Sequence, residues 1–202
     1  MTPSPHRPDS PDPATIRFAI GASSLGCVLV ALGDDGPVAI TLGDDPATLR
    51  HALQARFPTA RPAQDEHDMA ACLAMVTACI DRPWALLDDA MAVPPDRPES
   101  GFLNHFPAGT AFQRQVWRAL RAIPCGTTIT YAELAARVGR PGAARAVAGA
   151  CAANMLAVII PCHRVIRGDG SLSGYRWGAA RKRLLLERER AWAASRTSAA
   201  SG

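Results

Sequence analysis

The chain has 202 residues, 48% hydrophobic and 20% charged, which is typical of a globular protein long enough to bury a core. No stretch reaches the apolar length of a membrane span, and the Pro-rich start "MTPSPHRPDSPDPAT" lacks the apolar segment of a secretory signal. The six cysteines form no C-x-x-C pair and no zinc-finger spacing. We therefore expect free thiols in the cytoplasm, with neither a metal nor a cofactor.

The net charge of +4 is unevenly distributed along the chain. Residues 1–100 carry 7 Arg and 14 acidic residues, a net charge of −7, whereas residues 101–202 carry 15 Lys and Arg and 4 acidic residues, a net charge of +11. This asymmetry fits a two-lobed protein whose second lobe binds a polyanion. A solvated basic face would give the same pattern, so charge alone leaves both interpretations open.

The front part of the chain alternates between strand and helix patterns. "TIRFAIG", "SSLGCVLVAL" and "VAITL" predict strands, while "DDPATLRHALQARF" and "DEHDMAACLAMVTACI" predict helices. We therefore expect a lobe over residues 15–90, built on a small antiparallel sheet with helices. It would follow a disordered leader at 1–14 and precede a Pro-rich linker at 91–109.

The next segments predict three short helices. "GTAFQRQVWRALRAI" and "TYAELAARVG" each open with a capping box, Thr110 with Gln113 and Thr130 with Glu133. "RPGAARAVAGACAAN" predicts another helix with Pro141 in its first turn, and the last two helices form a helix-turn-helix pattern. The small residues and single long cation, Arg145, of the last helix suit close approach to a DNA backbone. A tightly packed core helix is the alternative.

The apolar run "MLAVII" predicts a strand that leads into Pro161 and Cys162. A loop and the helix "AARKRLLLERERA" follow, and residues 192–202 are expected to be a disordered tail. In that helix Glu189 lies one turn beyond Leu185, which places a carboxylate near the buried side.

"IPCHRVI", "GSLSGYRWG" and "RKRLLLERE" resemble the O6-alkylguanine-DNA alkyltransferases, above all the methyltransferase half of bacterial Ada-type proteins. The resemblance implies an α/β (α+β) fold with a ribonuclease-H-like N-terminal lobe. It also implies a mostly helical, winged-helix-like lobe at 110–191 that binds double-stranded DNA through the minor groove. Such a protein flips the damaged nucleotide out. It then accepts the alkyl group of O6-alkylguanine, or of O4-alkylthymine, irreversibly on its cysteine, and we expect a monomer.

The resemblance also implies a role for individual residues. Cys162 would be the nucleophile, and because a free thiol of pKa ~8.5 is mostly protonated at neutral pH, it needs a base. His163 would be that base, acting through a water, with Glu189 orienting it. Asn154 would position the site, and Tyr131 would rotate the target phosphate and donate a proton to guanine.

Two further sets of residues follow from the same motifs. Arg145 would fill the gap left in the base stack. The other DNA-binding positions are small residues of the same helix: Ala143, Ala144, Ala146 and Gly149. The wall of the base pocket would be formed by Ser171, Ser173, Tyr175 and Trp177.

Two residues near the motif depart from the family pattern. Trp177 stands where some members have glycine, which predicts a narrower pocket and a preference for small alkyl groups. Met155 follows Asn154 where a proline is usual. Arg164, Cys125 and Cys151 are expected to be structural.

Two other functions remain compatible with parts of this pattern. A cysteine hydrolase would also use a Cys-His-acid set, but would turn over an ester or amide repeatedly. A lesion sensor would flip the base without covalent change, although such proteins lack the cysteine. Individually, Cys162 could be a buried structural thiol, His163 a core histidine and Glu189 part of a solvated helix face. Tyr131 and Arg145 could be packing and surface residues.

Overall fold

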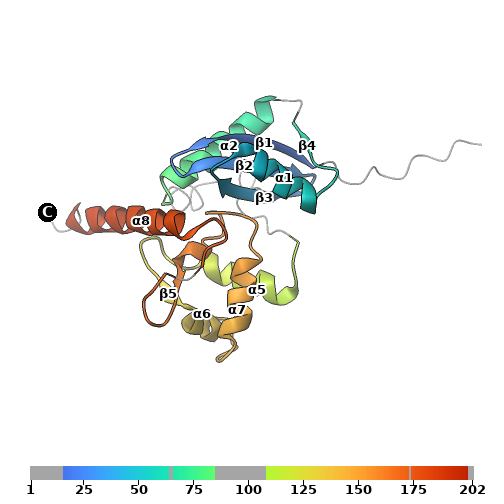
Figure 1. Cartoon of the computed structure of the whole chain (residues 1–202). Coiled ribbons are helices and arrows are strands. Elements are labelled where there is room, and N and C mark those ends of the chain that lie inside the picture. Colours follow the sequence, from blue (N-terminus) through green and yellow to red (C-terminus); the bar gives the residue numbers. More distant parts are fainter. Residues whose placement is uncertain (1–15, 64–65, 85–107, 173, 200–202) are drawn as a thin grey trace, which may run out of the picture.

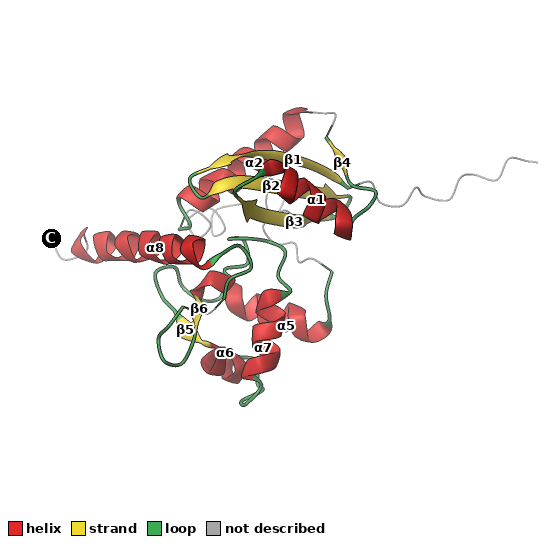
Figure 2. Cartoon of the chain, viewed as in Figure 1, coloured by secondary structure: helices red, strands yellow, loops and turns green. Residues whose placement is uncertain are grey.

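The computed structural model describes residues 16–63, 66–84, 108–172 and 174–199. A sheet lobe comes first and a helical lobe second, with the last helix, α8, running along both at one side (Figure 1). Figure 2 shows that strands dominate the first lobe and helices the second. The expected leader, most of the expected linker and Ser173 lie outside the described residues.

The first lobe is built on a four-stranded sheet in the order β3-β2-β1-β4. Its strands are β1 (Arg17–Ser23), β2 (Gly26–Gly33), β3 (Gly36–Gly43) and β4 (Arg61–Pro62). The first three pair antiparallel as expected. Because β4 pairs in parallel with β1, the sheet is mixed, and the expectation of a purely antiparallel sheet is wrong in this respect.

One helix packs on each face of this sheet. Helix α1 (Pro46–Arg56) contacts β2 and β3, and α2 (Glu66–Asp81) contacts β1 and β2. Along β2, Leu29 belongs to the α1 side of the core, whereas Val28 belongs to the α2 side. Successive strand residues point to opposite faces, so a strand covered on both sides reads as the continuous apolar run seen in the sequence.

The second lobe contains the predicted helix-turn-helix. Its elements are α5 (Ala111–Arg121), β5 (Ile129–Thr130), α6 (Tyr131–Arg137), α7 (Ala144–Ala152), the 3₁₀ turn η1 (Cys162–Arg164), β6 (Val165–Ile166) and α8 (Ala179–Ala199). Both predicted capping boxes are present, at Thr110 and at Thr130. Pro141 was expected in the first turn of α7, but it lies before the helix begins. Gly142, at φ +91°, keeps the chain in a turn, and α7 begins only at Ala144.

The expected strand over 155–160 is absent. Leu156 makes a single parallel bridge with Ile40 of β3, through Ile40 N–H to the Met155 carbonyl (2.7 Å) and Ala157 N–H to the Ile40 carbonyl (3.0 Å). The chain then turns because Val158 has φ of +66°, which no extended strand allows. The bend after Asn154 is thus held by hydrogen bonds to the sheet lobe, with Met155 as one of the bonded residues.

Helix α8 joins the two lobes. Arg181 Nε donates to the Leu25 carbonyl (2.7 Å), Arg188 donates to the Ile80 carbonyl (3.1 Å), and Trp192 stacks on Trp84 with ring centroids 5.8 Å apart. The helix continues through Ala199, so residues 192–199 are helical and the expectation of a disordered tail is wrong for them. No described helix is long and apolar enough to cross a membrane.

Candidate active site

Cys162 opens the 3₁₀ turn η1, which packs against α5 and α8. Cys162 N–H donates to the Ile160 carbonyl (2.7 Å), and Arg164 N–H donates to the Pro161 carbonyl (3.0 Å), which closes a tight turn around the thiol. Cys162 is only 6% exposed. Burial raises the pKa of its thiol, although the Asn154 hydrogen bond and the nearby cations Lys182 and Arg176 oppose this. The resting group is therefore a thiol that must lose its proton to react.

Asn154 is fully buried and bonds both to the segment that leads into the turn and to the thiol itself. Its Nδ2 donates to the Ile160 carbonyl (2.9 Å) and contacts Cys162 Sγ at 3.3 Å. Its Oδ1 accepts from Leu156 N–H at 2.8 Å. A buried amide with both ends satisfied holds one geometry, so Asn154 fixes the thiol relative to the bridge at Leu156.

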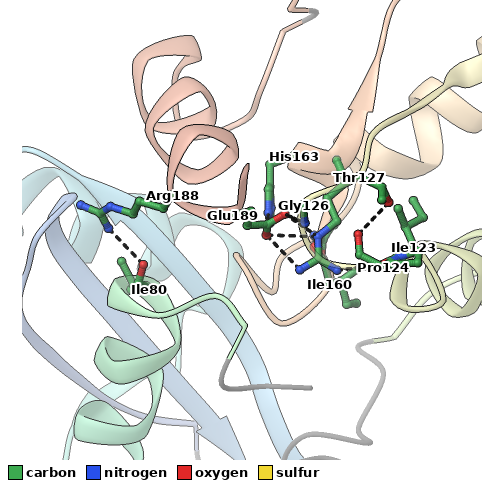
Figure 3. A network of polar contacts seen from close by, with 11 residues as sticks. Ile80, Ile123, Pro124, Gly126, Thr127, Ile160, His163, Arg188 and Glu189 are labelled. Atoms are coloured by element: carbon green, nitrogen blue, oxygen red, sulfur yellow. Dashed lines mark hydrogen bonds and ion pairs between the residues drawn. The ribbon is translucent and has the colours of Figure 1, made fainter. Parts of the chain in front are cut away.

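Behind Cys162, His163 and Arg164 converge on Glu189 of α8, and all three side chains are buried. Glu189 Oε1 accepts from His163 Nε2 (2.8 Å) and from Arg164 Nη2 (2.9 Å). Glu189 Oε2 accepts from Arg164 Nε (3.0 Å) and from Gly126 N–H (3.1 Å). Figure 3 shows His163 and Gly126 reaching the carboxylate from different segments of the lobe.

This network sets the charges behind the thiol. Burial opposes ionisation of Glu189, but hydrogen bonds from His163 and Arg164 outweigh it and lower the pKa of Glu189 to about 2. Burial also lowers the pKa of His163 and outweighs the opposing effect of Glu189. A neutral imidazole that donates from Nε2 leaves its basic lone pair on Nδ1, and Nδ1 has no hydrogen-bond partner among the described residues. Sequence reasoning expected this histidine–glutamate pair, and Arg164 buttresses it.

A cavity of about 580 Å³ opens in front of Cys162. It is lined by Tyr131, Ala144, Arg145, Ala148, Cys151, Ala152, Cys162, Arg167, Gly174, Tyr175 and Arg176. Four of the residues singled out in the sequence thus surround the thiol: Tyr131, Ala144, Arg145 and Tyr175. Asn154, His163 and Glu189 support Cys162 from behind rather than lining the cavity.

Of the remaining predicted wall residues, the two that the structure describes, Ser171 and Trp177, do not line it. Trp177 is buried and packs edge-on against Tyr175, with ring centroids 5.0 Å apart, so it lies behind the wall and does not line the pocket as expected. The preference for small alkyl groups stays a prediction. Ser171 is exposed, and its hydroxyl bonds Asp169 in a local turn. Ser173 lies outside the described residues.

The predicted DNA-binding positions lie on the two helices of the helix-turn-helix, and all except Gly149 lie near a helix start. Tyr131 is the first residue of α6, directly after the capping Thr130. Arg145 is exposed near the start of α7, and the small residues Ala146 and Gly149 are also exposed, while Ala143 is half-buried at the N-cap. Because most of these positions are Ala or Gly, this side of α7 carries few long side chains.

Several residues around the thiol were missed or misjudged from the sequence. Lys182 is fully buried, and its Nζ donates to the Val165 carbonyl (2.6 Å). Burial lowers the pKa of Lys182. The sequence feature that could have drawn attention to Lys182 is that it is the only lysine in an Arg-rich chain. Cys151, expected to be structural, lines the cavity together with Ala144, Ala148 and Ala152, and their helical spacing could have placed all four on one face.

All six cysteines are free thiols, as expected. Within the described ranges no three His, Cys, Asp or Glu side chains gather as metal ligands.

Comparison with known proteins identifies the family. The model of the 6-O-methylguanine DNA methyltransferase DNA-binding domain matches residues 111–191. The bifunctional transcriptional activator/DNA repair enzyme Ada of Escherichia coli K12 is 49% identical over 174 residues, covering 86% of this chain and 45% of that protein. The chain spans about half the length of the curated relatives it matches, 45% to 47%.

Solved structures match over most of their length. The Mycobacterium tuberculosis OGT in complex with DNA is 29% identical, with a TM-score of 0.62, covering 87% of this chain and 93% of that one. A variant of the M. tuberculosis O6-methylguanine methyltransferase is 30% identical, with a TM-score of 0.60 and the same coverage. The chain belongs to the O6-methylguanine DNA methyltransferase family.

Proposed function

We propose that this protein repairs alkylated DNA by moving the alkyl group from O6 of guanine, or O4 of thymine, to Sγ of Cys162. The observation that carries the proposal is the position of Cys162. Its thiol lines a cavity of about 580 Å³ in front and is backed by a buried histidine–glutamate pair. The names of the relatives, an O6-methylguanine methyltransferase and a DNA repair enzyme, support the same reaction.

In the proposed reaction each side chain of the site has one role. The Cys162 proton passes through a water to His163 Nδ1, and Glu189 stabilises the imidazolium. The thiolate sulfur bonds the alkyl carbon as the carbon–O6 bond breaks, and the electron pair stays on O6. Guanine then takes a proton, for which we propose Tyr131 as the donor. Because a thioether has no carbonyl for water to attack, the adduct persists and each molecule acts once.

DNA would bind on the side of the lobe that carries α6 and α7. The exposed small residues Ala146 and Gly149, with Ala143 and Ala144 at the helix start, allow the helix to approach the minor groove closely. Arg145, exposed at the rim of the cavity, would occupy the space of the extruded base. We propose that one copy serves one lesion, in the cytoplasm.

The test is the intact mass of the protein after mixing with duplex DNA that contains one O6-methylguanine. We expect a gain of one methyl group in place of a hydrogen, mapped to Cys162 and absent in Cys162→Ser. Cys151→Ser is the matched control, because this second thiol also lines the cavity and should leave the adduct on Cys162. Lesion-selective binding without a mass change would reject the transfer and leave a sensor. Repeated turnover of an ester would instead indicate a hydrolase.

A further inference from the structure

Three arginines and no acidic residue line the cavity among the described residues, namely Arg145, Arg167 and Arg176. We infer that Arg176 is a positioning residue that binds a backbone phosphate next to the extruded nucleotide. The inference rests on the proposed function, since it assigns a contact with the same DNA substrate.

Arg176 is anchored at one atom of its guanidinium. Nε donates to the Ala152 carbonyl at 3.0 Å. Ala152 is the last residue of α7, where backbone carbonyls lack partners within the helix and the helix dipole favours a cation. The bond therefore limits the positions of the side chain and ties the loop that carries Tyr175 to the end of α7.

The two terminal amino groups of Arg176 remain available. Arg176 is exposed, and these groups have no hydrogen-bond or ion-pair partner among the described residues. Two other arginines of the second lobe differ, because each has an acidic partner. Arg164 forms an ion pair with Glu189, and Arg181 forms one with Asp44. A planar guanidinium held at Nε offers its remaining N–H groups as a fork, which matches the oxygens of a phosphate.

The position of Arg176 relative to the reacting atoms points to the lesion strand. It lines the same cavity as Cys162 and is near enough to be among the cations that favour the Cys162 thiolate. A nucleotide whose base enters this cavity must leave its phosphates at the rim, where Arg176 lies. An anchored cation there would bind the flipped conformation better than the stacked one, which is the property a positioning residue needs.

The experiment compares Arg176→Gln with wild-type protein on two substrates that carry the same alkyl group, a duplex carrying O6-methylguanine and the free base O6-methylguanine. The free base has no phosphate. We expect the ratio of the single-turnover transfer rates, duplex over free base, to fall on the order of 10-fold in Arg176→Gln, the effect typical of one charge-assisted hydrogen-bonding contact. The slope of log affinity for the duplex against log salt should become shallower by about 0.9.

Two further variants complete the design. Arg183→Gln, on the exposed face of α8 and outside the cavity, removes the same charge and should keep the wild-type ratio. Arg176→Lys keeps the charge but loses the fork, so its ratio should lie between those of wild type and Arg176→Gln.

Two results would overturn the inference. An unchanged ratio and salt slope in Arg176→Gln would mean that Arg176 binds no phosphate. Equal loss on both substrates would mean that Arg176 acts on the thiol or only on the pocket loop. If wild-type protein transfers no alkyl group from either substrate, the proposed function fails by itself. The salt slope for lesion DNA then still decides whether Arg176 contacts phosphate.

Discussion

The two sides of the His163 ring differ in how completely their polar atoms are hydrogen-bonded. On the Nε2 side, Glu189 accepts from His163, from Arg164 and from Gly126 N–H, and Arg164 also donates to the Ile123 carbonyl (2.7 Å). On the other side, His163 Nδ1 and the Tyr175 hydroxyl are buried without a hydrogen-bond partner among the described residues.

This difference is informative because a buried polar atom without a partner costs free energy. The fold satisfies the Nε2 side entirely from its own groups, which makes that side rigid. The two unpartnered atoms are those that a water or a substrate could satisfy. The Tyr175 ring meets the His163 ring edge-on at 6.4 Å, so both atoms belong to one region of the site. We interpret the satisfied side as the support and the other as the reacting side, and four predictions test that division.

The largest expected effect is that of Glu189→Gln on stability. An amide cannot accept from all the donors that converge on this carboxylate, and Arg164 would be left as a buried charge without its partner. The free energy of unfolding should fall by about 3–5 kcal/mol, measured by urea denaturation. Glu187→Gln, exposed on the same helix, should change it by less than about 0.5 kcal/mol. Equal effects in the two variants would show that the network is not a stabilising support.

The second prediction concerns acid. The unfolded carboxyl of Glu189 binds a proton near its usual pKa of 4.5, whereas in the fold its pKa is about 2. The stability due to this group is therefore complete above pH 4.5 and is lost as the pH falls towards 2, by about 3 kcal/mol. The lowered pKa of His163 acts in the same direction below pH 6.5.

The measurement is the free energy of unfolding at a series of pH values for wild type and Glu189→Gln. The two curves should converge as the pH falls. Protonation of Glu189 removes from wild type the stability of the ionised carboxylate, which Glu189→Gln lacks at every pH. Parallel curves would contradict the assignment of the low pKa to Glu189.

The third prediction concerns Asn154, whose amide contacts the Cys162 thiol. Asn154→Ala leaves Leu156 N–H and the Ile160 carbonyl without their side-chain partners and should cost about 1–3 kcal/mol. It also removes the amide contact that favours the Cys162 thiolate, so alkylation of Cys162 by iodoacetamide should slow at neutral pH and recover at high pH.

Gln115→Ala is the matched control for Asn154→Ala. Its amide donates to one backbone carbonyl, of Val138, and neither residue lines the cavity in front of the thiol. We expect a smaller loss of stability and a wild-type pH profile of alkylation. A wild-type profile in Asn154→Ala as well would show that Asn154 supports the fold but not the thiolate.

The smallest effect on stability is expected for Tyr175→Phe, on the reacting side. Its hydroxyl has no partner to lose among the described residues, so the free energy of unfolding should change by less than about 0.5 kcal/mol. The rate of transfer from lesion DNA should nevertheless fall, because the hydroxyl is available to the bound base. A loss of stability above about 1 kcal/mol would mean that the hydroxyl is bonded within the protein and that the reacting side is not open.

How much of this protein could be predicted from the sequence depends on how far apart the interacting residues lie. The capping boxes at Thr110 and Thr130 join residues three apart, so local chemistry alone sets them. The helix-turn-helix follows from local patterns in the same way, whereas the roles of Cys162 and His163 were implied by the family resemblance. The alternation of β2 side chains between the two faces of the sheet is also local, because strand geometry points successive residues to opposite faces.

The tertiary structure decided how the surroundings of the thiol are assembled, although the family resemblance had implied the His163–Glu189 pair. His163 and Glu189 are 26 residues apart, and Gly126 and Glu189 are 63 apart, so their meeting depends on how α8 packs against the lobe. Packing also places Trp177 behind Tyr175 and turns the expected strand at Val158 into a loop held by Ile40. Local propensity therefore specified the elements, and the family resemblance identified the reactive pair. Burial and long-range hydrogen bonds determined which atoms near that pair are satisfied and which remain available for a substrate.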